Sequence, residues 1–150
     1  MNAESQRPLK IVVFEDNAAD VQLLREALME NRIAFDLEVF EDGEQVHQYL
    51  AANSPRPVAD IFVIDLNLPK VTGDEVLFHI RQDQKLSGVP VLVLTSSDSA
   101  RDRARVMGLG ATAFLRKPCA LDEYFEIGKV IERLVKTEAP VAAANQSGAA

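Results

Sequence analysis

The chain has 150 residues, of which 47% are apolar, and its formal net charge is -7. This length suits one domain with a continuous core, whereas nonspecific binding to nucleic acid requires a basic patch that an acidic chain does not predict. No stretch is apolar for long enough to cross a bilayer, and residues 1–8 lack an apolar run, so we expect a cytoplasmic protein without a membrane partner. The single cysteine, Cys119, excludes an internal disulfide and a cysteine metal cluster.

The first half of the chain alternates short apolar runs with segments of helical spacing. Residues 9–14 are almost all apolar, which is typical of a strand buried on both faces. After them, Val21, Leu24 and Leu28 recur at the spacing of one helix face. The elements predicted in this half are a strand over 9–14, a helix over 18–31, a strand over 35–40, a weaker helix over 43–52, a loop over 53–57 and a strand over 60–65.

The second half repeats the same alternation. It predicts a helix over 73–83, a strand over 90–95, a helix over 97–107, a strand over 111–116 and a helix over 120–136. Five strands that lack polar alternation and are separated by helices predict a doubly wound α/β three-layer sandwich around a parallel sheet. We expect one domain over residues 9–136, with residues 1–8 and the alanine-rich tail 137–150 disordered.

Polar side chains follow the predicted strands at one edge of the sheet, where open α/β sheets bind their ligands. These residues are Glu15, Asp16, Asn17, Asp65, Thr95, Ser96 and Lys117. Carboxylates are the hard oxygen ligands that Mg²⁺ prefers, and a cation would relieve their mutual repulsion. An aspartate can attack phosphorus, while a lysine neutralises charge on the transferred group and hydroxyls donate hydrogen bonds to its oxygens. The pattern therefore favours a phosphoryl-accepting site with a metal ion.

Each of these residues also has a structural interpretation when it is taken alone. Asp16 or Asn17 can cap the following helix, Thr95 can be a turn residue, and Lys117 can be a surface lysine. Asp65 is different, because it ends an apolar run in which an unpaired charge would be costly. The joint position of all of them at one edge favours function.

Four separated motifs identify a family resemblance. The segments VVFEDN, DLNLPKVTG, LVLTSS and FLRKP lie at the ends of the first, third, fourth and fifth predicted strands. Together they resemble the receiver domain of bacterial two-component response regulators over residues 9–136. The resemblance implies a flavodoxin-like strand order 2-1-3-4-5, and Mg²⁺ or Mn²⁺ as the cofactor. It also implies that a histidine kinase or phosphotransfer protein phosphorylates Asp65.

The resemblance also assigns roles within the site. It implies that Glu15, Asp16 and Asp65 bind the metal together with the backbone carbonyl of Asn67, and that Lys117 pairs with the phosphoryl group. Thr95 and Ser96 would contact its oxygens, and Phe114 would be the switch aromatic that moves with Thr95. Pro118 would follow a cis peptide bond. Three open points are that Glu15 replaces the commoner aspartate, that Phe114 lacks a hydroxyl, and that Asn67 and Ser97 hold positions that tune loss of the phosphoryl group.

The expected output is protein binding, because about fourteen residues after the last helix are too few for an output domain. The resemblance implies that the signal passes through the surface of the fourth helix, fifth strand and fifth helix. Apolar residues cover roughly 220° of the fifth helix, whereas packing on a sheet needs somewhat more than about 100°, so we expect some to be exposed and a homodimer or partner contact to cover them. These residues are Leu121, Tyr124, Phe125, Ile127, Val130, Ile131, Leu134 and Val135.

Charges on the last two helices fit the same surface. Reciprocal pairing across a dimer, or a solvated face, would suit Arg101, Arg103 and Arg105 on the one helix and Glu123, Glu126 and Glu132 on the other. The two histidines, His47 and His79, fall on different helices, and we expect surface or packing roles for both.

Three other functions remain as alternatives. An aspartyl-phosphate phosphatase usually has a second aspartate two residues after the nucleophile, where this chain has Asn67. A flavodoxin-like or nucleotide-binding module would need a phosphate loop in place of Glu15 and Asp16. A receiver that serves as a docking scaffold without phosphorylation is the third alternative. The chain is not expected to be an enzyme.

Overall fold

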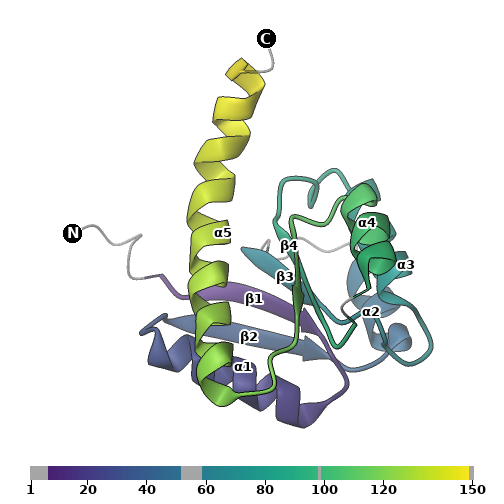
Figure 1. Ribbon diagram of the computed structural model, residues 1–150. Helices are drawn as coiled ribbons and strands as arrows, with labels where there is room; N and C mark the ends of the chain where they lie inside the picture. Colours follow the sequence, from purple (N-terminus) through teal and green to yellow (C-terminus); the bar gives the residue numbers. More distant parts are fainter. Residues whose placement is uncertain (1–6, 52–58, 98, 149–150) are drawn as a thin grey trace.

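The computed structural model describes residues 7–51, 59–97 and 99–148. In these parts of the chain five strands alternate with five helices (Figure 1). The strands are β1 (Leu9–Phe14), β2 (Phe35–Phe40), β3 (Ile61–Ile64), β4 (Val91–Thr95) and β5 (Ala113–Arg116). The helices are α1 (Ala18–Glu30), α2 (Gly43–Ala51), α3 (Gly73–Gln82), α4 (Ala100–Gly108) and α5 (Leu121–Gly148).

The strands form one parallel sheet in the order β2-β1-β3-β4-β5. Its register places Ile11 beside both Leu37 and Ile61, and Val93 beside both Ile64 and Phe114. This is the flavodoxin-like order, and the predicted doubly wound α/β fold is confirmed. The strand order reverses between β1 and β3, so the crevice at their carboxyl ends is the expected ligand position.

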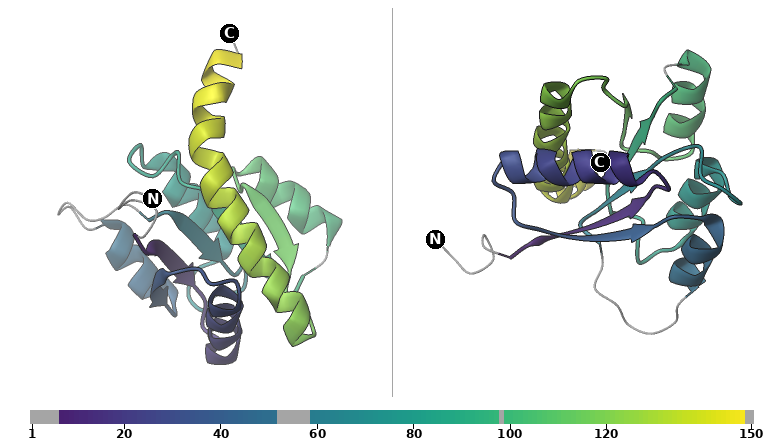
Figure 2. Two further views of the ribbon diagram at one scale, coloured as in Figure 1. Left: turned by 90° about the vertical axis from the view of Figure 1, so that its left-hand side faces the viewer. Right: turned by 90° about the horizontal axis from the view of Figure 1, so that it is seen from below.

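The sheet separates two hydrophobic clusters, because alternate side chains of each strand point to opposite faces. On one face Val12 and Phe14 of β1 pack with residues of α2, α3 and α4, such as Leu77. On the other face Ile11 packs with residues of α1 and α5, such as Ile131. Figure 2 shows the two helix layers from two further directions. Both faces of the sheet are therefore buried, which explains the continuous apolar runs of the strands.

Helix boundaries differ from the prediction by more than one residue at two places. α4 begins at Ala100 and not at residue 97, because the Ser99 hydroxyl caps it by accepting hydrogen bonds from the N–H groups of Arg101 and Asp102. α5 continues to Gly148, beyond the predicted end at residue 136, and extends clear of the sheet (Figure 1). Alanine is the best helix former, and an existing helix is extended at little cost. The predicted loop over 53–57 and residues 1–6 lie outside the described residues.

The expected cis peptide bond before Pro118 is absent. Every peptide bond in the described parts of the chain is trans, so this prediction is wrong, and the bond adopts the lower-energy isomer of an X–Pro pair. Among the same residues, no helix is both long enough and apolar enough to span a bilayer.

Candidate functional site

Three carboxylates meet where β1 and β3 end. Glu15 directly follows β1 and Asp65 directly follows β3, and the N–H of Asp65 donates to the carbonyl of Phe14 at 3.0 Å. With Asp16 they present carboxylate oxygens that lie within 4.8 Å of one another. Glu15 and Asp65 are only 6% and 7% exposed, whereas Asp16 is exposed to solvent. The sequence prediction that these three residues converge is confirmed.

Backbone amides two residues further along hold the two buried carboxylates. The N–H of Asn17 donates to Oε2 of Glu15 at 3.1 Å, and the N–H of Asn67 donates to Oδ1 of Asp65 at 3.0 Å. Asn17 also caps α1, because its side-chain oxygen accepts from the N–H groups of Ala19 and Asp20. The cap is therefore Asn17, and the Asp16 carboxylate is left to face the site.

The ammonium of Lys117 reaches this cluster from the end of β5. Its Nζ lies 2.8 Å from Oε1 of Glu15, 2.9 Å from Oδ2 of Asp65 and 2.7 Å from Oδ2 of Asp20. Its side chain is 10% exposed. Lys117 is therefore part of the site and not a surface lysine. Asp20 was not predicted as a site residue, because its partner Lys117 is 97 positions away in the chain. The only sequence signal was that Asp20 is an acidic residue in the first turn of α1.

A tyrosine of α5 completes the contacts of Asp20. The hydroxyl of Tyr124 donates to Oδ1 of Asp20 at 3.4 Å, and Tyr124 is 1% exposed. Burial raises the pKa of the Tyr124 phenol above its usual value, and the Asp20 charge raises it further. Tyr124 therefore stays a neutral hydrogen-bond donor at neutral pH.

Burial and charge also shift the ionisation of Glu15 and Lys117. Burial, with the Asp65 charge, outweighs the hydrogen bond from Lys117 and raises the pKa of Glu15 to about 7. For Lys117, burial favours the neutral amine, but the hydrogen bonds to Asp20, Asp65 and Glu15 dominate and raise its pKa. The site thus holds a fixed ammonium among carboxylates, and the Glu15 carboxylate exchanges its proton near neutral pH.

The remaining predicted site residues lie around this cluster at different depths. Thr95 is fully buried at the end of β4, and its Oγ1 accepts from the N–H of Ser97 at 3.4 Å. Ser96 and Asn67 are exposed. Phe114 is 4% exposed, and the guanidinium of Arg103 lies 4.9 Å from its ring centre. Phe114, the predicted switch aromatic, is therefore packed inward and contacted by α4.

Two hollows adjoin the cluster. One, of about 290 Å³, is lined by Leu66, Asn67, Thr72, Asp74, Ser97, Asp102 and Arg105. At its side Arg105 pairs with Asp74 and Asp102, and the Ser97 hydroxyl donates to Asp102 at 2.5 Å. The other, of about 270 Å³, lies beside Glu15 and Asp16 and is also lined by Glu41. Both hollows thus lie next to residues that carry or flank the carboxylates.

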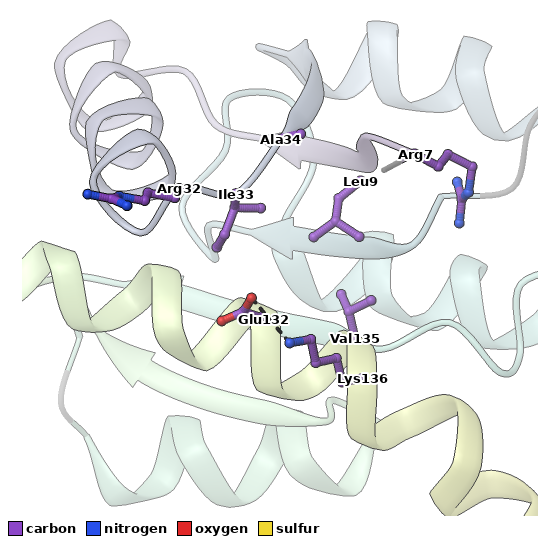
Figure 3. Close-up of a pocket in the computed structure, with 8 residues that line it drawn as sticks. All are labelled: Arg7, Leu9, Arg32, Ile33, Ala34, Glu132, Val135 and Lys136. Carbon is purple, nitrogen blue, oxygen red and sulfur yellow. Dashed lines mark ion pairs between the residues drawn. The ribbon is translucent and has the colours of Figure 1, made fainter. Parts of the chain in front are cut away.

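A third hollow, of about 260 Å³, lies at the opposite edge of the sheet, where β1 and β2 begin (Figure 3). Leu9, Ile33 and Val135 line it, and the Glu132–Lys136 ion pair lies at its side. It is remote from Asp65 along the strands and is not part of the acidic site.

The two histidines meet on the α2–α3 surface. The rings of His47 and His79 lie 5.7 Å apart at an angle of 78°, and both residues are exposed. This agrees with the predicted surface roles, although sequence periodicity could not show that the two rings touch.

The fold and the acidic cluster together define a class of protein. A doubly wound parallel sheet that carries buried carboxylates and one lysine at its switch point is the arrangement of a receiver domain. The family of the response regulator receiver domain matches residues 11–128, and the chain belongs to this family.

Relatives and solved structures cover almost the whole chain. The response regulator Rcp1 of Synechocystis is 36% identical over 137 residues, which are 88% of this chain and 92% of Rcp1. The phosphorylated cyanobacterial phytochrome response regulator RcpA has a TM-score of 0.75 at 34% identity, and the match covers 87% of this chain and 96% of RcpA. The Mn²⁺-bound form of Rcp1 has a TM-score of 0.72 at 35% identity, and the match covers 84% of this chain and 93% of the Rcp1 chain.

Proposed function

We propose that this receiver domain accepts a phosphoryl group on Asp65, with Mg²⁺ or Mn²⁺ as the cofactor. The observation that carries the proposal is the contact between Lys117 and the Asp65 carboxylate at 2.9 Å, inside a cluster of three carboxylates. A nucleophile, a charge-neutralising cation and oxygen ligands for a metal thus lie within one crevice.

The donor set fits a hard divalent cation. Glu15, Asp16 and Asp65 offer carboxylate oxygens within 4.8 Å of one another, and the backbone carbonyl of Asn67 would add a fourth oxygen. Mg²⁺ is bound in proteins by one or two carboxylates with waters and phosphate oxygens. When bound, the cation would offset the negative charge on the phosphoryl oxygens.

The transfer itself needs few protein groups. An Asp65 carboxylate oxygen attacks phosphorus, and the bond from phosphorus to the donor's imidazole nitrogen breaks as the new oxygen–phosphorus bond forms. The imidazole keeps the bonding electron pair and takes up a proton. Lys117 moves one N–H from the carboxylate to the phosphoryl group, while Thr95 and Ser96 offer hydroxyl donors.

The phosphodonor we propose is a histidine kinase or phosphotransfer protein of phytochrome-type signalling. Support comes from RcpA, which is described as a phytochrome response regulator and covers 87% of this chain in structure. The test compares phosphotransfer rates from a phytochrome kinase and from a chemotaxis kinase. A faster rate from the chemotaxis kinase would contradict this choice of donor.

The output we propose is binding through the α4–β5–α5 surface. Phe114 of β5 lies under Arg103 of α4, so a change at Phe114 reaches this surface directly. Met107 of α4 and Leu121 of α5 are 41% and 46% exposed there. A partner protein or a second copy of the chain would cover these side chains.

The apolar residues of α5 support a binding surface less than the width of their arc on the helix suggested, because most of them are covered within the chain. Tyr124, Ile127 and Ile131 are buried, and Phe125, Leu134 and Val135 pack on the cluster shared with α1. The arc is wide because α5 covers both the sheet and α1. The predicted charge pairing is also reduced, since Arg105, Glu126 and Glu132 already have partners within the chain. If the hydrodynamic radius is that of a monomer both with and without phosphorylation, the homodimer hypothesis is excluded.

The decisive experiment is intact-mass analysis after incubation with acetyl phosphate. We expect one phosphoryl adduct that requires both Mg²⁺ and Asp65, and no adduct in Asp65→Asn. Absence of an adduct from the wild type with acetyl phosphate and also with kinase would indicate a docking scaffold.

A further inference from the structure

We propose that Asp20 is a positioning residue for phosphoryl transfer, because it holds the Lys117 ammonium beside Asp65 through a contact that metal binding leaves in place. Tyr124 fixes Asp20 in turn. This inference deepens the proposed phosphoacceptor function and rests on it.

The three N–H donors of an ammonium match the three carboxylates around Lys117. Two of these, Glu15 and Asp65, also belong to the carboxylate cluster that fits a cation, whereas Asp20 does not. A cation therefore competes for two of the three partners that Lys117 has among the described residues. Phosphorylation removes the free carboxylate of Asp65 as well. Asp20 is the partner that stays available throughout the reaction.

The position of Asp20 is fixed from two sides. Its backbone N–H donates to the capping side chain of Asn17 at 3.1 Å, which sets its place in the first turn of α1. Its two carboxylate oxygens are used separately, with Oδ2 at 2.7 Å from Lys117 Nζ and Oδ1 accepting from the Tyr124 hydroxyl at 3.4 Å. Tyr124 is 1% exposed, so its hydroxyl has little freedom to turn elsewhere. The carboxylate is thus aimed at Lys117 by α5.

Two effects follow from losing this carboxylate. Lys117 would then depend on Glu15 and Asp65 alone, so it would compete more strongly with the cation for them. At saturating Mg²⁺ the ammonium would lack its third support and would be placed less well for the phosphoryl group, which slows the transfer. Asp20→Asn is therefore expected to change both Mg²⁺ affinity and the rate at saturating Mg²⁺.

The experiment measures these two quantities separately. The Mg²⁺ dissociation constant of the unphosphorylated protein is taken from thermal shift and calorimetric titration at fixed salt. The rate of adduct formation from acetyl phosphate at saturating Mg²⁺ is taken from intact mass. We expect Asp20→Asn to raise the dissociation constant by about fivefold and to slow the rate by about tenfold.

Three further variants test whether the effect is specific to the Asp20 contact. Glu41→Gln removes a carboxylate that lines the hollow beside Glu15 and Asp16 and lies outside the contacts of Lys117, and both quantities should stay within about twofold of the wild type. Tyr124→Phe removes only the hydroxyl and should shift both quantities in the direction of Asp20→Asn, by about twofold. Asp20→Glu restores the charge and should recover part of the rate.

The outcomes separate this inference from the function on which it rests. Equal effects of Asp20→Asn and Glu41→Gln would overturn it, because the loss of any nearby negative charge would then account for both. A wild-type rate in Asp20→Asn at saturating Mg²⁺ would overturn it too. If Asp20→Asn does not fold, a Tyr124→Phe protein with wild-type Mg²⁺ affinity and rate overturns it. If the wild type takes no phosphoryl group, the phosphoacceptor function fails, and an unchanged Mg²⁺ affinity in Asp20→Asn would separately reject the Asp20 contact.

Discussion

The backbone N–H of Lys117 donates a 2.7 Å hydrogen bond to the carbonyl oxygen of Thr95. The residue that ends β4 thus holds the backbone of the lysine just beyond β5. The ammonium of Lys117 then extends to Glu15, Asp20 and Asp65. The lysine is thus the cation of this cluster, and a bound metal ion would compete with it for Glu15 and Asp65.

Lys117→Met is therefore predicted to have opposite effects on binding and on reaction. Without the ammonium, Mg²⁺ no longer competes with a lysine for the carboxylates, so Mg²⁺ affinity should rise by about tenfold. Phosphorylation at saturating Mg²⁺ should become slower by a factor of at least about ten, because charge on the phosphoryl group is no longer offset by the lysine. Calorimetry and intact mass measure the two effects. Weaker Mg²⁺ binding in this variant would contradict the proposed competition.

Gly73→Ala is predicted to destabilise the protein by about 2–3 kcal/mol. A Cβ at Gly73 would lie 2.7 Å from the Cα of Leu66 and 2.9 Å from the carbonyl oxygen of Asp65. The backbone that carries Asp65 would have to move. Gly88→Ala is the matched control, since a Cβ there meets nothing within 4 Å, and its effect should stay within about 0.5 kcal/mol. Urea denaturation compares the two, and equal losses would contradict the close approach at Gly73.

Arg81→Lys is predicted to cost about 1–2 kcal/mol although it keeps the charge. The guanidinium donates to the carbonyl of Gly110 at 2.9 Å and to that of Val89 at 2.8 Å, so it joins α3 to the segments before β4 and β5. One ammonium cannot reach both positions in the same planar geometry. Arg101→Lys, at an exposed position of α4, serves as the control in urea denaturation. A loss no larger than that of the control would contradict the bridging role.

The stability of the metal-free protein is predicted to depend on pH through Glu15. The pKa of Glu15 is about 7 in the folded protein and 4.5 as its reference value. The folded state therefore binds more protons between these values, and the stabilisation is complete below pH 4.5 and lost as the pH rises through 7. The loss is on the order of 2 kcal/mol.

Urea denaturation of the wild type and of Glu15→Gln, at pH 5 and at pH 8 without divalent cations, measures this contribution. The wild type should lose more stability than the variant between the two pH values. Identical pH dependence in both proteins would show that burial does not raise the pKa of Glu15.

Much of the site could be predicted because it depends on local rules. Apolar runs that end in Glu15 and Asp65 mark strand ends, and parallel strand ends share one edge. The contact of Asp20 with Lys117 could not be predicted, since periodicity shows which face a residue occupies and not which distant side chain it meets. The exposure of the α5 arc was overestimated for the same reason, because the packing of α1 on α5 was not visible in the pattern. Ser99 is one of three serines in the segment before α4, and the sequence alone could not show which of them caps the helix.

The length of α5 makes it a lever. Its 28 residues extend about 42 Å at the rise of an α-helix, while Tyr124, which contacts Asp20, lies in its first turn. A tilt of about 5° at this fixed end would move the far end by about 4 Å. A tilt of α5 too small to change the packing around Asp20 would thus still produce a displacement that a partner bound to the distal turns of the helix could detect.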